Sequence, residues 1–135
     1  MSHTGPGPFE NEDAQNFLAS LASLEPAALR QHLQAAAHTD EDDYLEASAG
    51  AVALAAAELV VAALGKPHPM LPDAAQRWVA HHGSTLTDAD RTLGTQAVAR
   101  VIATESELAE IWADEGGAAW NTEVRRLITR MRDAG

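Results

Sequence analysis

A long run of small apolar residues constrains the fold of this chain more than any other feature. From Ala47 to Leu64 the sequence reads ASAGAVALAAAELVVAAL, and Glu58 is the one ionisable residue in it. Its length lies at the short end of the roughly 17–25 residues of a membrane-spanning helix. Half of the run is alanine, Glu58 lies past its middle, and an acidic segment precedes it. These features oppose insertion, so we expect a buried helix and no membrane span.

The composition predicts a single intracellular domain. With 135 residues the chain is long enough to enclose its own core, and we assign residues 1–135 to one domain. It has no cysteine, which excludes disulfides, thiolate zinc sites and cysteine nucleophiles and fits a reducing cytoplasm. The start of the chain lacks the basic and apolar parts of a signal peptide. We therefore expect a cytoplasmic protein whose residues 1–8 form a partly flexible lead-in.

Apolar periodicity indicates helices along nearly the whole chain, and no convincing alternating strand occurs. We predict an all-α fold: a single compact domain of about six or seven helices around a long central Ala-rich helix at about residues 41–64. Asn11 is the expected N-cap of the first helix, and Gly65 is the expected end of the central one. Before Asn11, glycines and prolines predict an ordered, non-helical lead-in that buries Phe9.

The charge balance is acidic and unevenly distributed. The chain has 20 acidic and nine basic residues and a net charge of −11; Arg30 is the only base in residues 1–65. This balance argues against nucleic acid as a partner. The acidic half suits a basic partner protein or a cation, although the same charges can simply keep the protein soluble. The interaction-surface candidates are the consecutive acids Asp40, Glu41, Asp42 and Asp43.

Glu58 is the residue whose chemistry most needs an explanation, because an unpaired carboxylate is costly to bury. On a helix its face carries small side chains, among them Ala51 and Ala62. Glu46, the other carboxylate of interest, lies about 18 Å away along the axis and about 120° around it. The two carboxylates, both candidates for a functional or buried polar role, therefore cannot form a pair within this helix.

Any partner of Glu58 must come from another helix. Arg100, Arg77 or a histidine can neutralise it, and Glu107 with Glu110 can join it around a cation. Bundle metal sites usually contain Glu-x-x-His motifs, and this chain has none. We expect a structural counter-charge at Glu58, with no metal ligands, no cofactor and no catalytic residues.

Several segments together resemble an uncharacterised bacterial family among the domains of unknown function. These segments are GPGPFENEDA at residues 5–14, YLE at 44–46, AAAELVVA at 55–62, ELAEIW at 107–112, and Trp120. Family members open with Gly-x-Trp-Gly-x-Gly-Pro-Phe-(Asp/Glu)-Asn-Asp, whereas this chain has Ser2 and Thr4 at the opening Gly and Trp positions. The resemblance implies a small, soluble, mainly helical cytoplasmic protein without a known activity, and Glu46 and Glu58 are its acidic positions within the matching motifs.

Two functional hypotheses follow from the sequence. The first is a non-catalytic cytoplasmic domain that binds another protein or itself, in the manner of small immunity proteins that neutralise toxins. The alternative is a helical ligand- or divalent-metal-binding domain with a carboxylate site around Glu58. We expect the first, and we do not expect an enzyme.

Overall fold

The described residues fold into helices joined by loops. The structure, a computed structural model, describes residues 7–40, 42–114 and 117–134. Within these ranges there is no β-strand, and the all-α prediction is confirmed. The described α-helices are α1 (Glu12–Ala19), α2 (Pro26–Ala37), α3 (Ala47–Ala63), α4 (Asp73–His82), α5 (Asp88–Val101), α6 (Glu107–Asp114) and α7 (Ala118–Asp133).

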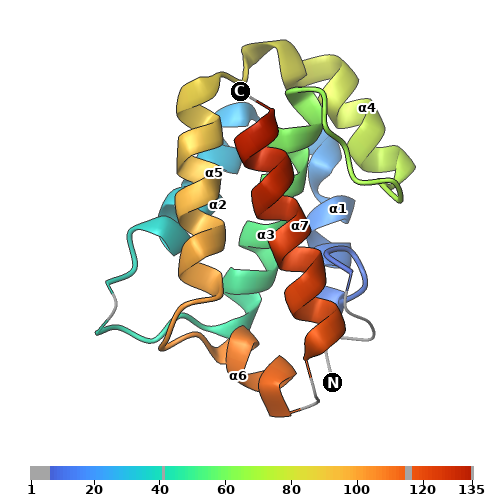
Figure 1. The fold of residues 1–135 in the computed structure, drawn as a ribbon. Coiled ribbons are helices and arrows are strands. Elements are labelled where there is room, and N and C mark those ends of the chain that lie inside the picture. Colours follow the sequence, from blue (N-terminus) through green and yellow to red (C-terminus); the bar gives the residue numbers. More distant parts are fainter. Residues whose placement is uncertain (1–6, 41, 115–116, 135) are drawn as a thin grey trace.

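Helix α3 occupies the centre of the molecule. It packs against each of the six other α-helices. In Figure 1 it lies behind α7, with α6 and α4 at opposite ends of the molecule. Its residues from Ala53 to Val61 are all buried, Glu58 included. Small side chains let neighbouring helices approach from several directions, so an Ala-rich helix suits this position. In the described part of the chain no helix combines the length and apolar character of a membrane span.

The end of α3 follows the sequence prediction. Gly65 adopts a left-handed conformation with φ +100°, which favours glycine. Its N–H donates to the carbonyl of Ala62 at 3.1 Å, and the N–H of Lys66 donates to that of Val61 at 3.0 Å. This pair of hydrogen bonds is a Schellman motif, which satisfies carbonyls that the helix end leaves without partners.

The start of α3 differs from the prediction. The helix begins at Ala47 and not near residue 41, because the preceding backbone is bonded to other parts of the molecule. Leu45 forms an isolated parallel bridge with Ser106: its N–H donates to the carbonyl of Glu105 at 2.8 Å, and its carbonyl accepts from Glu107 at 2.9 Å. These backbone groups are therefore not available for helical hydrogen bonds.

The lead-in to α1 is ordered from Gly7 onward, as predicted. Phe9 is buried, and its carbonyl accepts a hydrogen bond from the side chain of Gln15 at 2.6 Å. Asn11 is the N-cap, and its Oδ1 accepts from the N–H of Ala14 at 2.7 Å. The rest of the predicted flexible lead-in lies outside the described residues.

A buried carboxylate fixes the first turn of α5 to α2. Asp90 is 4% exposed and accepts two hydrogen bonds from Arg30, at 2.7 and 3.1 Å, and one from the N–H of Thr87 at 2.9 Å. Burial alone would raise the pKa of Asp90, but the hydrogen bonds from Arg30 and Thr87 and the charge of Arg30 outweigh it. The pKa of Asp90 is therefore lowered from 3.8.

This lowered pKa predicts a loss of stability in acid. The charged form of Asp90 stabilises the fold fully above the unfolded value of about 3.8, and this contribution disappears as the pH falls through the lower folded value. Asp90→Asn should therefore be less stable than the wild type at about pH 7, and the difference should shrink below about pH 3.8. Urea unfolding across this pH range measures it. A difference that stays constant with pH would contradict the assignment.

Candidate functional site

Glu58 forms a buried ion pair with Arg130 of α7. The Glu58 side chain is 1% exposed, and its two oxygens accept from the two terminal nitrogens of Arg130 at 2.8 and 3.0 Å. Arg130 also donates to the carbonyl of Lys66 at 3.4 Å. Two parallel charge-assisted hydrogen bonds are the strongest geometry available to such a pair. The ion pair thereby joins the central helix to α7, and the guanidinium of Arg130 also joins α7 to the chain that follows α3.

The partner of Glu58 is not among those proposed from the sequence. Arg100 is buried elsewhere, and Arg77 is exposed on α4. The apolar stripe of α7 consists of Trp120, Val124, Leu127 and Met131. Arg130 lies off this stripe, so apolar periodicity gave no reason to select it. A signal was nevertheless present: at 100° per residue Arg130 shares a helix face with Arg126 and Glu123, next to the buried stripe.

The other proposed carboxylates do not join Glu58. Glu46 is exposed and directly precedes α3, while Glu107 accepts a hydrogen bond from the N–H of Ala47 at 2.7 Å and so caps that helix. A cation at Glu58 would have to displace the guanidinium of Arg130. Within the described ranges, no three His, Cys, Asp or Glu residues are grouped as a metal site would require.

Arg100 of α5 is a buried cation that binds backbone carbonyls. It is 6% exposed, and the ion pairs found among the described residues do not include it. Its guanidinium donates to carbonyl oxygens of two loops, at 2.6 to 3.2 Å; these belong to Thr39, Asp40, Asp43, Thr104 and Glu105. One side chain therefore holds the loop before α3 against the loop before α6.

The acidic residues proposed as an interaction surface lie in the first of these loops. Asp40, Asp42 and Asp43 are exposed, and Glu41 lies outside the described residues. Because Arg100 takes up the carbonyls of this loop, it cannot continue α3 toward the N-terminus as the sequence suggested. The acids are instead held on the surface beside α6.

Tyr44 and Glu110 form a hydrogen-bonded pair next to this loop. The phenol donates to Glu110 Oε1 at 2.6 Å, and Tyr44 is 47% exposed. The hydrogen bond to Glu110 raises the pKa of Tyr44 from 10.0 to about 12, with smaller contributions from burial and from the carboxylates of Glu110, Glu107 and Glu105.

This pair can be titrated without interference, because Tyr44 is the only tyrosine in the chain. We expect ultraviolet absorbance of the phenolate to give a pKa of about 12 in the wild type. In Glu110→Gln the value should fall toward 10.0, because the charged acceptor is lost. Circular dichroism at each pH serves as the control for unfolding. Equal midpoints in the two folded proteins would show that the hydrogen bond does not form in solution.

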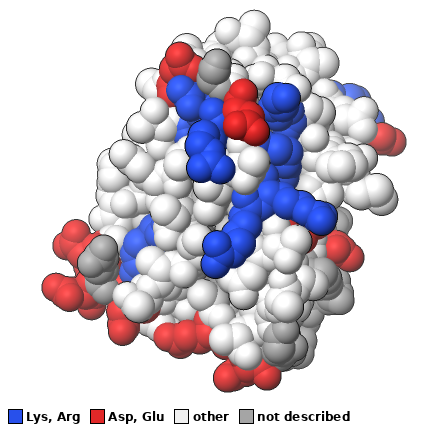
Figure 2. Space-filling model, in the orientation of Figure 1, with Lys and Arg blue, Asp and Glu red and all other residues white. Residues whose placement is uncertain are grey.

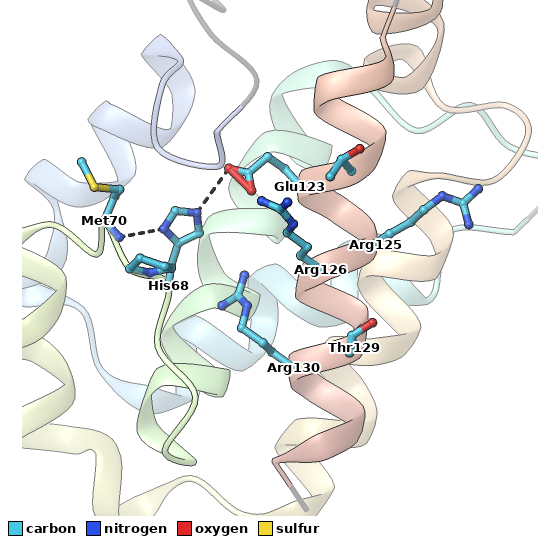
Figure 3. Close-up of a pocket in the computed structure, with 9 residues that line it drawn as sticks. His68, Met70, Glu123, Arg125, Arg126, Thr129 and Arg130 are labelled. Atoms are coloured by element: carbon cyan, nitrogen blue, oxygen red, sulfur yellow. Dashed lines mark hydrogen bonds and ion pairs between the residues drawn. The ribbon is translucent and has the colours of Figure 1, made fainter.

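A pocket of about 690 Å³ lies between α7 and the loop that follows α3. The loop contributes His68, Pro69 and Met70, and α7 contributes Thr122, Glu123, Arg125, Arg126, Thr129 and Arg130 (Figure 3). Prolines at positions 67, 69 and 72 indicate a loop after the central helix. Nothing local in the sequence indicates that this loop runs beside α7 and forms a pocket with it. Three arginines thus line a pocket in a chain whose net charge is −11.

The loop wall of this pocket is anchored. The Nδ1 of His68 accepts from the N–H of Met70 at 2.9 Å, and its Nε2 lies 3.3 Å from Glu123 Oε1 on α7 (Figure 3). Since Nδ1 accepts, Nε2 carries the proton and donates to Glu123 in the neutral ring. The contact of Arg130 with the Lys66 carbonyl holds the beginning of the loop as well. The pocket is therefore formed before any ligand arrives.

Comparison with known proteins agrees with the resemblance drawn from the motifs. Residues 3–123 match the model of a family described as a domain of unknown function (DUF4259). The opening motif and the bacterial origin remain predictions. No curated protein and no solved structure matches the chain.

Proposed function

We infer that this chain, which belongs to the DUF4259 family of domains of unknown function, is a non-catalytic protein-interaction domain. The observation that carries this inference is that the buried polar side chains of the described residues already have partners inside the fold. Glu58 pairs with Arg130, Asp90 with Arg30, and Arg100 with backbone carbonyls, while Ser106 accepts from a backbone N–H at 3.4 Å. These buried groups stabilise the fold, so the charged side chains on the surface are the ones available to bind another molecule.

The surface charges are unevenly distributed, which supports a binding role. Figure 2 shows basic side chains concentrated along the middle of the face in view; acidic ones lie beside them near the top and at the right, and several more lie at the lower left and toward the α6 end. The basic group includes Arg125, Arg126 and Arg130 of α7, whereas Asp42 and Asp43 belong to the acidic loop. Neighbouring surface regions of opposite sign steer a complementary partner and disfavour others.

Two finer expectations belong to this proposal. The absence of cysteine fits a cytoplasmic location. The small size and acidic charge are similar to those of immunity proteins that neutralise toxins, an analogy that rests on general features and not on a shared site. Neutralising a partner needs only a stable surface, which the internally paired charges provide.

Affinity capture with charge-reversed variants tests the proposal. The tagged wild type should retain a partner from a lysate of its source organism in a defined ratio, measured by native mass spectrometry. Asp42→Lys/Asp43→Lys or Arg125→Glu/Arg126→Glu should lose that partner without a change in melting temperature, because these side chains are exposed. Identical recovery by the wild type, both variants and tag alone would overturn the proposed function.

A further inference from the structure

The pocket beside α7 has features that specify a ligand class. The assignment of that class to a protein partner rests on the proposed function. We propose that this pocket binds an acidic peptide segment of the partner, with carboxylates at Arg125 and Arg126 and an apolar side chain beside Met70. Its volume of about 690 Å³ lies within the roughly 300–1,000 Å³ typical of ligand sites. It can receive one or two side chains of such a segment.

Two of the three arginines in the pocket remain available for a ligand. Arg130 is bound to Glu58, but no other described residue has an ion pair or hydrogen bond with the guanidinium of Arg125 or Arg126. Both side chains are exposed on α7. An anionic ligand would therefore gain their charge without breaking a bond of the fold.

The directions of these side chains favour a peptide over a small anion. In Figure 3 Arg126 lies on the side of α7 that faces His68, whereas Arg125 extends away from it. A single phosphate or carboxylate cannot contact both guanidinium groups when they point in different directions. An extended segment with several carboxylates can cross the helix and contact both. Arginine also forms planar, bidentate hydrogen bonds with carboxylates.

The apolar part of the pocket adds a second requirement. Met70 is 79% exposed, and Pro69 is exposed next to it. A flexible, polarisable methionine at the edge of a pocket is suited to covering an apolar side chain of a partner. The loop that carries it is anchored by His68 and Arg130, so little ordering cost accompanies binding. The preferred segment thus combines acidic residues with leucine-like ones.

Fluorescence anisotropy with synthetic peptides tests this assignment. The probe is a fluorescein-labelled peptide of repeated Asp-Glu-Leu, compared with one in which lysine replaces the acids and one in which serine replaces leucine. The acidic, leucine-containing peptide should bind the wild type most tightly, and its affinity should fall with added salt. Arg125→Glu/Arg126→Glu should weaken it by about tenfold or more.

A matched variant separates the pocket from net charge. Arg77→Glu/Arg132→Glu makes the same change in charge at exposed positions outside the pocket and should alter the affinity by no more than about twofold. Met70→Gln should weaken the leucine peptide but not the serine peptide. Equal effects of the two double variants, or displacement of the peptide by millimolar inorganic phosphate, would overturn the assignment.

The outcome also distinguishes this proposal from the proposed function. If the peptide does not bind but the captured partner is lost in Asp42→Lys/Asp43→Lys, the pocket assignment fails and the interaction function stands. If the peptide binds as described but no partner is retained by any form of the protein, the pocket assignment stands and the interaction function loses its support.

Discussion

Arg130→Met is expected to lower the free energy of unfolding by about 3–5 kcal/mol, because it leaves the carboxylate of Glu58 buried without a counter-charge. The two side chains share two hydrogen bonds, and Glu58 is 1% exposed and cannot turn to solvent without displacing its neighbours. Methionine fills much of the volume of the arginine stem, so the loss measures the charge and not a cavity. Urea unfolding monitored by tryptophan fluorescence gives the value.

Two further variants show whether the ion pair is the cause. Glu58→Gln should cost less than Arg130→Met, because the Arg130 side chain is 18% exposed and can reach water when its partner is neutral. Glu58→Leu/Arg130→Met should recover most of the loss, since a buried pair can be replaced by apolar side chains at little cost. If the losses of Glu58→Leu alone and Arg130→Met alone add up to the loss of this double variant, the two side chains do not interact.

Arg100→Ala is expected to have the second large effect. It removes a guanidinium that donates to five backbone carbonyls, and hydrogen bonds to a charged group contribute about 1.5–3 kcal/mol each. Water can replace some of them, so we expect a loss of at least about 3 kcal/mol, equivalent to two such bonds. The loss should be accompanied by faster hydrogen exchange at the amides of Leu45 and Glu107, which bridge the two loops.

Arg100→Lys is the matched control, because it keeps the charge but has three donors on a compact head group. It should recover part of the stability without restoring protection at both bridge amides, since one ammonium cannot reach carbonyls on all sides. Protection at Leu45 and Glu107 that is unchanged in Arg100→Ala would mean that the loops are held together without this side chain.

Much of the fold could be predicted from local patterns. Gly65 ends the central helix and Asn11 caps the first because their chemistry acts on neighbouring backbone groups. The apolar stripe of α7 is buried as its spacing indicates, with Val124, Leu127 and Met131 in the core. These features depend on residues a few positions apart, so they can be predicted from short stretches of the sequence.

The candidate site could not be predicted to the same extent. The sequence places Arg100 and Arg130 on helices, but the partners of these two side chains depend on how α5 and α7 pack against α3. That placement brings Arg130 to Glu58 and directs Arg100 to the carbonyls of Asp40 and Asp43. The start of α3 differs from the predicted position for the same reason, because a side chain distant in sequence binds those carbonyls.

By itself the sequence determined that α3 is a central helix with one carboxylate that must be neutralised, because burial of Glu58 follows from its apolar surroundings. Tertiary structure decided which cation neutralises it, where the acidic loop is held, and that Arg125 and Arg126 line a pocket with Met70. Helix periodicity fixes which side chains share a face, whereas contacts between residues distant in sequence depend on how the faces pack together.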